Sequence, residues 1–129
     1  MYLAQILNYL DRAPEALPHA RAAIDACPIC PHWYLGILAQ THLLSGDARA
    51  AIDVLLVAID REPESLGDHA NLAIGYAMLG RAREARRTVT RLRCLDADYR
   101  ARDYVRDRPY ADPEVIGRLG RLLREAGLA

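Results

Sequence analysis

The residues best suited to chemistry lie close together near position 30. Cys27 and Cys30 are separated by two residues, and His32 follows two positions later. Two thiolates and an imidazole at this spacing could hold zinc, or the thiols could form a redox pair. Structural zinc normally takes four ligands, and the sequence has no second Cys-x-x-Cys pair and no strand–helix–strand pattern around this one. We therefore expect no metal and no cofactor here.

Other groupings that could support catalysis are not visible in the sequence. The four histidines are spread along the chain, and none stands in a pattern with serine and an acid. There is no glycine-rich phosphate loop of the GxxxxGK type. The sequence therefore predicts a protein that is not an enzyme.

Arginines crowd the segment 81–93, where Glu84 is the one acid. Arg83, Arg87 and Arg91 recur every fourth residue, so on a helix they share a face. This face is either a solvated outer surface or a docking strip for an acidic protein surface. Over the whole chain 17 basic and 17 acidic residues cancel, which gives no reason to expect nucleic acid or a membrane as a partner.

The elements that must position these residues are revealed by an internal repeat. A shift of 34 residues superimposes small and apolar positions: Leu38 on Leu72, Ala39 on Ala73, Gly46 on Gly80, Ala51 on Ala85 and Leu55 on Val89. The matched positions share faces of two consecutive helices, and the glycines fall where the chain must reverse. A shift of 35 extends the pattern back to Leu3, so the first unit is incomplete.

This periodicity predicts an all-α fold in two parts. Residues 1–99 form about three helical hairpins, and residues 100–129 form a C-terminal helical cap. Pro18 lies within one expected helix and should kink it or delay its start. The helices are expected at 1–10, 14–26, 31–44, 48–61, 66–79, 82–95, 98–106 and 112–126.

The last of these helices has clear start signals. Asp112 is suited to the N-cap, Pro113 to the first helical position, and Glu114 to the first turn. An apolar stripe follows: Val115, Ile116, Leu119, Leu122 and Leu123. The stripe suits a helix that covers the end of a repeat array, and a detachable partner-binding helix is the alternative.

The segments GDARAAIDVLLVAIDREP and LAIGYAMLGRAREAR resemble parts of tetratricopeptide (TPR) repeats. Together with PHWYLGILAQTHLLSGDARAAI and DRPYADPEVIGRLGRLLREAGL, residues 28–129 are similar to the C-terminal repeat region of bacterial class III adenylate/guanylate cyclases. The resemblance implies a right-handed superhelix of antiparallel hairpins. Cyclase chemistry in that family belongs to a separate domain, so an accessory signalling role is implied.

In such repeats the first helix of each hairpin lines a groove that holds a partner. The corresponding positions predict an apolar partner-binding surface made of Trp33, Gly36, Gln40, Leu43, Gly67, Ala70, Asn71, Ile74 and Ala77. Trp33 either anchors a partner or packs between adjacent hairpins. His42 takes the place of Tyr76 in the next repeat, so we expect it in the core. Paired basic groups beside Asn71 are missing, so we expect no binding of acidic chaperone tails.

The sequence thus predicts a non-enzymatic, cytoplasmic protein–protein interaction module with a protein or peptide partner. No apolar stretch is long enough to span a bilayer. Two alternatives remain. The chain could self-associate through an exposed face at Leu3 and Leu7, or it could be part of a signalling enzyme whose catalytic domain precedes Met1.

Overall fold

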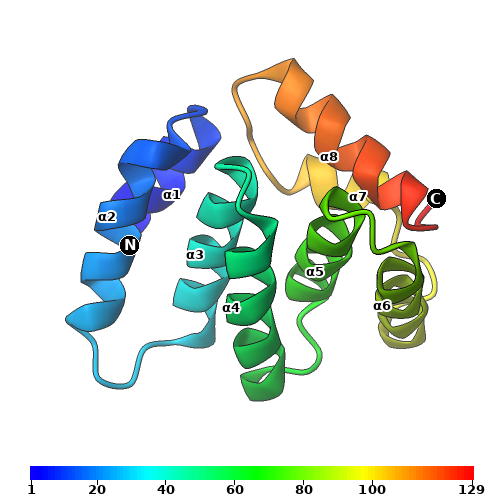
Figure 1. Cartoon of the computed structure of the whole chain (residues 1–129), viewed down its shortest axis with the longest axis horizontal. Helices are drawn as coiled ribbons and strands as arrows, with labels where there is room; N and C mark the ends of the chain where they lie inside the picture. Colours follow the sequence, from blue (N-terminus) through cyan, green and yellow to red (C-terminus); the bar gives the residue numbers. More distant parts are fainter.

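The computed structural model describes residues 1–129 as eight α-helices without strands (Figure 1). The fold class is therefore all-α, as predicted. The helices are α1 (Tyr2–Tyr9), α2 (Ala13–Asp25), α3 (His32–Leu44), α4 (Ala48–Arg61), α5 (Leu66–Met78), α6 (Ala82–Leu95), α7 (Ala101–Arg106) and α8 (Pro113–Glu125).

Seven helices begin within about a residue of the predicted positions, and α7 begins later. Tyr99 and Asp96 close a turn before it, and the Arg100 amide donates to Asp103 Oδ2 over 2.8 Å, which caps the helix start. Pro18 lies inside α2, which nevertheless begins at Ala13. Of the two effects expected of Pro18, a kink or a delayed start, the delayed start does not occur.

Local signals explain where the other helices begin and end. Asp47, Ser65 and Asp112 each accept a hydrogen bond from a backbone N–H in the first turn of α4, α5 and α8. Gly46 and Gly80 end the preceding segments with φ of +83° and +71°. Glycine adopts this left-handed conformation without a steric penalty, so both predicted chain reversals are confirmed.

The helices are arranged in two layers (Figure 1). Each helix from α1 to α6 packs against the next, and in addition α1 contacts α3 and α3 contacts α5. Helices α1, α3 and α5 therefore form one continuous layer, which we call the inner layer. Helices α2, α4 and α6 lie outside it. None of the helices has both the length and the apolar character needed to cross a membrane.

One core joins the repeats to the C-terminal segment. Val115, Leu119 and Leu123 of α8 are buried in the same cluster as Ala73 and Val89. Residues 1–99 and 100–129 thus share a core, and α8 packs on α5.

A smaller core lies at the N-terminal end, where α1 packs on α2 and α3. Leu7 is only 7% exposed and contacts a cluster with Ala16, Ala20 and Ile37. The expectation that Leu7 belongs to an exposed face is therefore wrong. Leu3, by contrast, is 50% exposed.

The chain between α6 and α8 crosses the inner layer and contacts α5, α3 and α1. The Tyr104 hydroxyl donates to Asn71 Oδ1 of α5, and the Gln40 amide of α3 donates to the Tyr110 hydroxyl. Beyond these contacts, the Ala111 amide donates to the Tyr9 carbonyl of α1 over 2.8 Å. Residues 99–112, which we call the crossing segment, therefore connect the last hairpin to the first helix.

Candidate binding site

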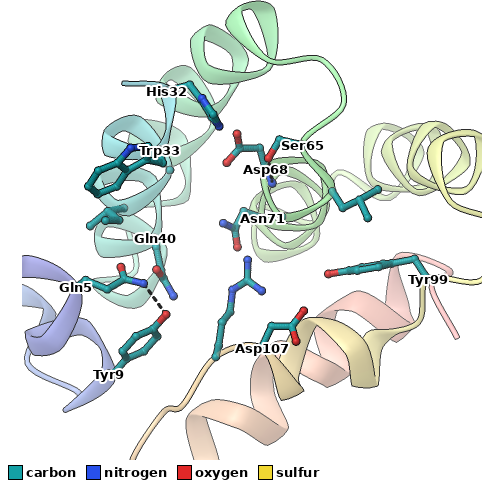
Figure 2. Close-up of a pocket in the computed structure, with 15 residues that line it drawn as sticks. Gln5, Tyr9, His32, Trp33, Gln40, Ser65, Asp68, Asn71, Tyr99 and Asp107 are labelled. Carbon is teal, nitrogen blue, oxygen red and sulfur yellow. Dashed lines mark hydrogen bonds between the residues drawn. The ribbon is translucent and has the colours of Figure 1, made fainter. Parts of the chain in front are cut away.

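A cavity of about 390 Å³ lies between the inner layer and the crossing segment (Figure 2). Helices α1 and α3, the start of α5 and the residues after α7 all contribute to its walls. The lining residues are Gln5, Tyr9, His32, Trp33, Gly36, Ile37, Gln40, Ser65, Leu66, Gly67, Asp68, Asn71, Tyr99, Asp107 and Arg108.

Lining residues on α1 and on α3 occupy helical positions one turn apart. Gln5 donates through Nε2 to the Tyr9 hydroxyl, at i and i+4 of α1, as the dashed line in Figure 2 shows. Gly36 and Gln40 have the same spacing on α3. Gln5 Oε1 is buried and has no hydrogen-bond partner. Hydrogen-bonding groups are therefore held in place and one of them is unused.

Asp68 is the buried charge of the cavity. It is the third residue of α5, where its backbone N–H donates to the capping Ser65 hydroxyl, and only 6% of the residue is exposed. Its Oδ2 has no hydrogen-bond partner, and it forms no ion pair within 4.0 Å. In Figure 2 its carboxylate points from α5 toward His32 of α3.

Burial raises the pKa of the Asp68 carboxyl above its ordinary value, because the charged form loses hydration. A hydrogen bond with Ser65 and the charges of His32, His69 and Arg108 act in the opposite direction and offset part of the rise. A Cβ on Gly36 would approach Asp68 Oδ1 to 3.1 Å, so the glycine makes room for the carboxylate.

Arg108 brings a positive charge into the cavity from outside the repeats. Its guanidinium carbon lies 3.7 Å from the centre of the Tyr104 ring, and its Nη1 donates to the Tyr104 carbonyl over 3.0 Å. Its Nη2 would be 2.9 Å from a Cβ on Gly67. Arg108 forms no ion pair within 4.0 Å, so an aromatic face and a carbonyl hold it.

The predicted partner-binding residues divide into two sets. Trp33, Gly36, Gln40, Gly67 and Asn71 do line the cavity. The outward placement of Leu43, Ala70 and Ile74 is wrong, since they are at most 2% exposed. They share the main core with Tyr104, Tyr110 and Leu119, because the crossing segment and α8 cover them.

Ala77 is half-buried and lies apart from the cavity, in a shallow depression beside Gly80 and Ala126. The surface is more mixed than the expected apolar one, because amide and charged side chains share the lining with Trp33, Ile37, Leu66 and two tyrosines. One arginine, Arg108, lines the cavity together with Asn71, and it comes from outside the repeats.

Trp33 packs between adjacent hairpins and is also accessible from the cavity, so its position is compatible with both roles considered from the sequence. Its ring packs edge-on to Tyr34, with centroids 4.5 Å apart, and tilted against Tyr2 of α1 at 5.6 Å. It thus fills space between adjacent hairpins. The residue also remains 38% exposed and lines the cavity, so a partner can reach it.

Of the candidate metal group, His32 lines the cavity, whereas Cys27 and Cys30 do not. No group of three or more His, Cys, Asp or Glu side chains in the chain could hold a metal ion. The Cys27 thiol donates to the Ile29 carbonyl, and Arg61 Nη1 donates to the Cys30 carbonyl.

His42 is buried, as expected of a core residue, and this burial lowers its pKa. Arg83, Arg87 and Arg91 are exposed on α6 and form no ion pair. This arrangement fits both a solvated face and a docking strip.

Sequence reasoning missed several lining residues, among them Gln5, Tyr9 and Asp68. The signal that could have found them is the spacing of polar residues one turn apart on the first helix of a hairpin, as in Gln5 with Tyr9 and Asp68 with Asn71. Fold and site together define the class of protein: it is an all-helical chain of paired helices with a cavity of mixed polar and apolar lining on its inner layer. No family model matches the chain, and no curated protein matches it. The geometry of the cavity therefore carries the functional proposal.

Proposed function

We propose that the chain is a non-enzymatic protein-interaction module of TPR type, a right-handed superhelix of hairpins that binds an extended segment of a partner in the inner-layer cavity. The observation that carries the proposal is the convergence of amides, a buried carboxylate and Trp33 on one space of about 390 Å³. A few fixed polar groups beside aromatic rings are typical of sites that orient a ligand.

The chemistry of the lining favours binding over catalysis. Gln5, Gln40 and Asn71 carry amide groups, which are suited to hydrogen bonding with peptide backbone. Ser65 is the one lining hydroxyl of nucleophilic type, and it accepts from the Asp68 amide and caps α5.

The likeness of residues 28–129 to the cyclase repeat region supports an accessory role in signalling. The chain would act either beside an enzyme or as one part of it. An antibody against residues 100–129 distinguishes the two on a blot of source cells. A band near 14 kDa indicates a separate module, and a much larger band indicates a multidomain protein.

Selection of phage-displayed peptides on the full chain tests the binding proposal. Gly36→Leu places a side chain into the cavity against Asp68, whereas Gly117→Leu adds the same side chain where a Cβ meets nothing within 4 Å. Selected peptides should bind the wild type and Gly117→Leu alike and bind Gly36→Leu at least tenfold more weakly, with helicity unchanged. If every selected peptide binds all three proteins equally, the cavity is not the binding site.

A second candidate function, self-association, is favoured by the outer side of α1. Four apolar residues there are at least half exposed: Tyr2, Leu3, Ile6 and Leu10. A second copy could cover this face. Sedimentation should then show a concentration-dependent dimer that Ile6→Glu disrupts, and a monomer at high concentration would dismiss the candidate.

A further inference from the structure

We infer that the cavity takes a basic side chain of the partner, an arginine or a lysine, with its cationic head on the Asp68 carboxylate. This inference rests on the proposed function and specifies the chemistry that the same site recognises.

The Asp68 carboxylate has a hydrogen-bond acceptor that nothing in the chain uses. Only 6% of the Asp68 surface is exposed, and its Oδ2 has no hydrogen-bond partner. A buried carboxylate without a counter-charge is costly, and buried charges in proteins are normally paired. An ionised carboxylate can only accept hydrogen bonds, so the group that completes it must be a donor, and a cationic donor completes it best.

The chain itself does not supply that donor. Arg108 is near enough to lower the pKa of Asp68 through its charge, but its guanidinium is fixed over the Tyr104 ring and bonded to the Tyr104 carbonyl. His32 and His69 face the same carboxylate, and His69 Nε2 is engaged with the Pro63 carbonyl at 2.8 Å. Asp68 therefore keeps a free oxygen although three positive or titratable groups surround it.

The rest of the lining suits a long basic side chain. Gln5 Oε1 is a second buried acceptor without a partner, and Asp107 adds another carboxylate to the lining. Trp33, 38% exposed, offers an aromatic face to the methylene stem or to the cation itself.

The test is a titration of the ¹⁵N-labelled full chain with N-acetyl-arginine amide and, as an isosteric neutral probe, N-acetyl-citrulline amide. We expect saturable NMR shifts at Trp33, Gly36 and Asn71 with the arginine probe and at least tenfold weaker binding of the citrulline probe. Asp68→Asn should reduce arginine binding at least tenfold. Asp53→Asn, which removes an exposed charge from α4, should leave it unchanged.

Three outcomes overturn the inference: no binding of the arginine probe, equal binding of the two probes, or undiminished binding by Asp68→Asn. Selected peptides that depend on Gly36 but contain no basic residue would also overturn it while the proposed function stands. Absence of any cavity-dependent peptide would remove the proposed function itself.

Discussion

Replacement of Asp68 by asparagine should make the unliganded chain more stable at neutral pH. The side chain keeps its size and shape, while the buried charge is removed. Asp68 is 6% exposed, has one oxygen without a partner, and forms no ion pair within 4.0 Å. A buried polar group left unsatisfied costs about 1–3 kcal/mol, and more when charged.

Part of this gain is offset, because a carboxylate in the first turn of α5 interacts favourably with the helix dipole by about 0.3–1 kcal/mol. The net expectation is a gain of about 1–2 kcal/mol in the free energy of unfolding. For a chain of this size, each kcal/mol raises the thermal midpoint by about 3–6 °C.

The gain should depend on pH with a defined sign. Burial raises the folded-state pKa of Asp68 above its unfolded value of about 3.9. Below the unfolded pKa, both states hold the proton and the charge has no cost. As the pH rises through the folded pKa, the carboxyl ionises at a penalty and stability is lost. The advantage of Asp68→Asn should therefore be present at pH 7 and absent near pH 3.

Urea denaturation of both proteins at pH 7 and pH 3 measures this difference directly, because all other carboxyl groups are common to the two. We expect Asp68→Asn to be the more stable protein at pH 7, and a lower stability than that of the wild type would contradict this expectation. In that case the carboxylate would be a satisfied structural group rather than one waiting for a ligand.

Three further perturbations probe the scaffold. Gly75→Ala places a Cβ 3.0 Å from the Ile52 side chain of α4 and should lower the free energy of unfolding by about 1 kcal/mol, even after its gain in helix propensity. Gly117→Ala places a Cβ in open space and should raise the free energy of unfolding by about 0.5–1 kcal/mol. Urea unfolding measures both changes. Tyr110→Phe removes the acceptor of the Gln40 amide and should lower the free energy of unfolding by about 1–2 kcal/mol. An unchanged unfolding midpoint would show that this contact of the crossing segment does not stabilise the fold. Burial raises the pKa of the Tyr99 hydroxyl to about 12. The stability that the buried, neutral hydroxyl contributes is therefore complete below about pH 10 and is lost as the pH rises through about 12. The difference in absorbance at 295 nm between the wild type and Tyr99→Phe should titrate near pH 12.

The repeats could be predicted from the sequence because each hairpin is specified locally. Apolar residues at helical spacing define the faces, Gly46 and Gly80 define the reversals, and Asp112 with Pro113 defines the start of α8. These signals lie within one or two turns of the residues that they position, so no knowledge of distant contacts is needed.

The site could be predicted only in part because the crossing segment has no periodicity. Its path depends on single long-range contacts, such as the Ala111 amide with the Tyr9 carbonyl and Tyr110 with Gln40. Those contacts decide that Leu43 is core rather than surface and that Arg108 enters the cavity. A pattern of neighbouring residues carries no information about such pairings.

The most direct test of the account is a map of intermolecular NOEs between a selected peptide and the full chain. We expect contacts from the peptide to the Trp33 ring and to the Asn71 side-chain amide, because both residues line the cavity. Contacts confined to the arginine face of α6 or to the exposed side of α1 would contradict it.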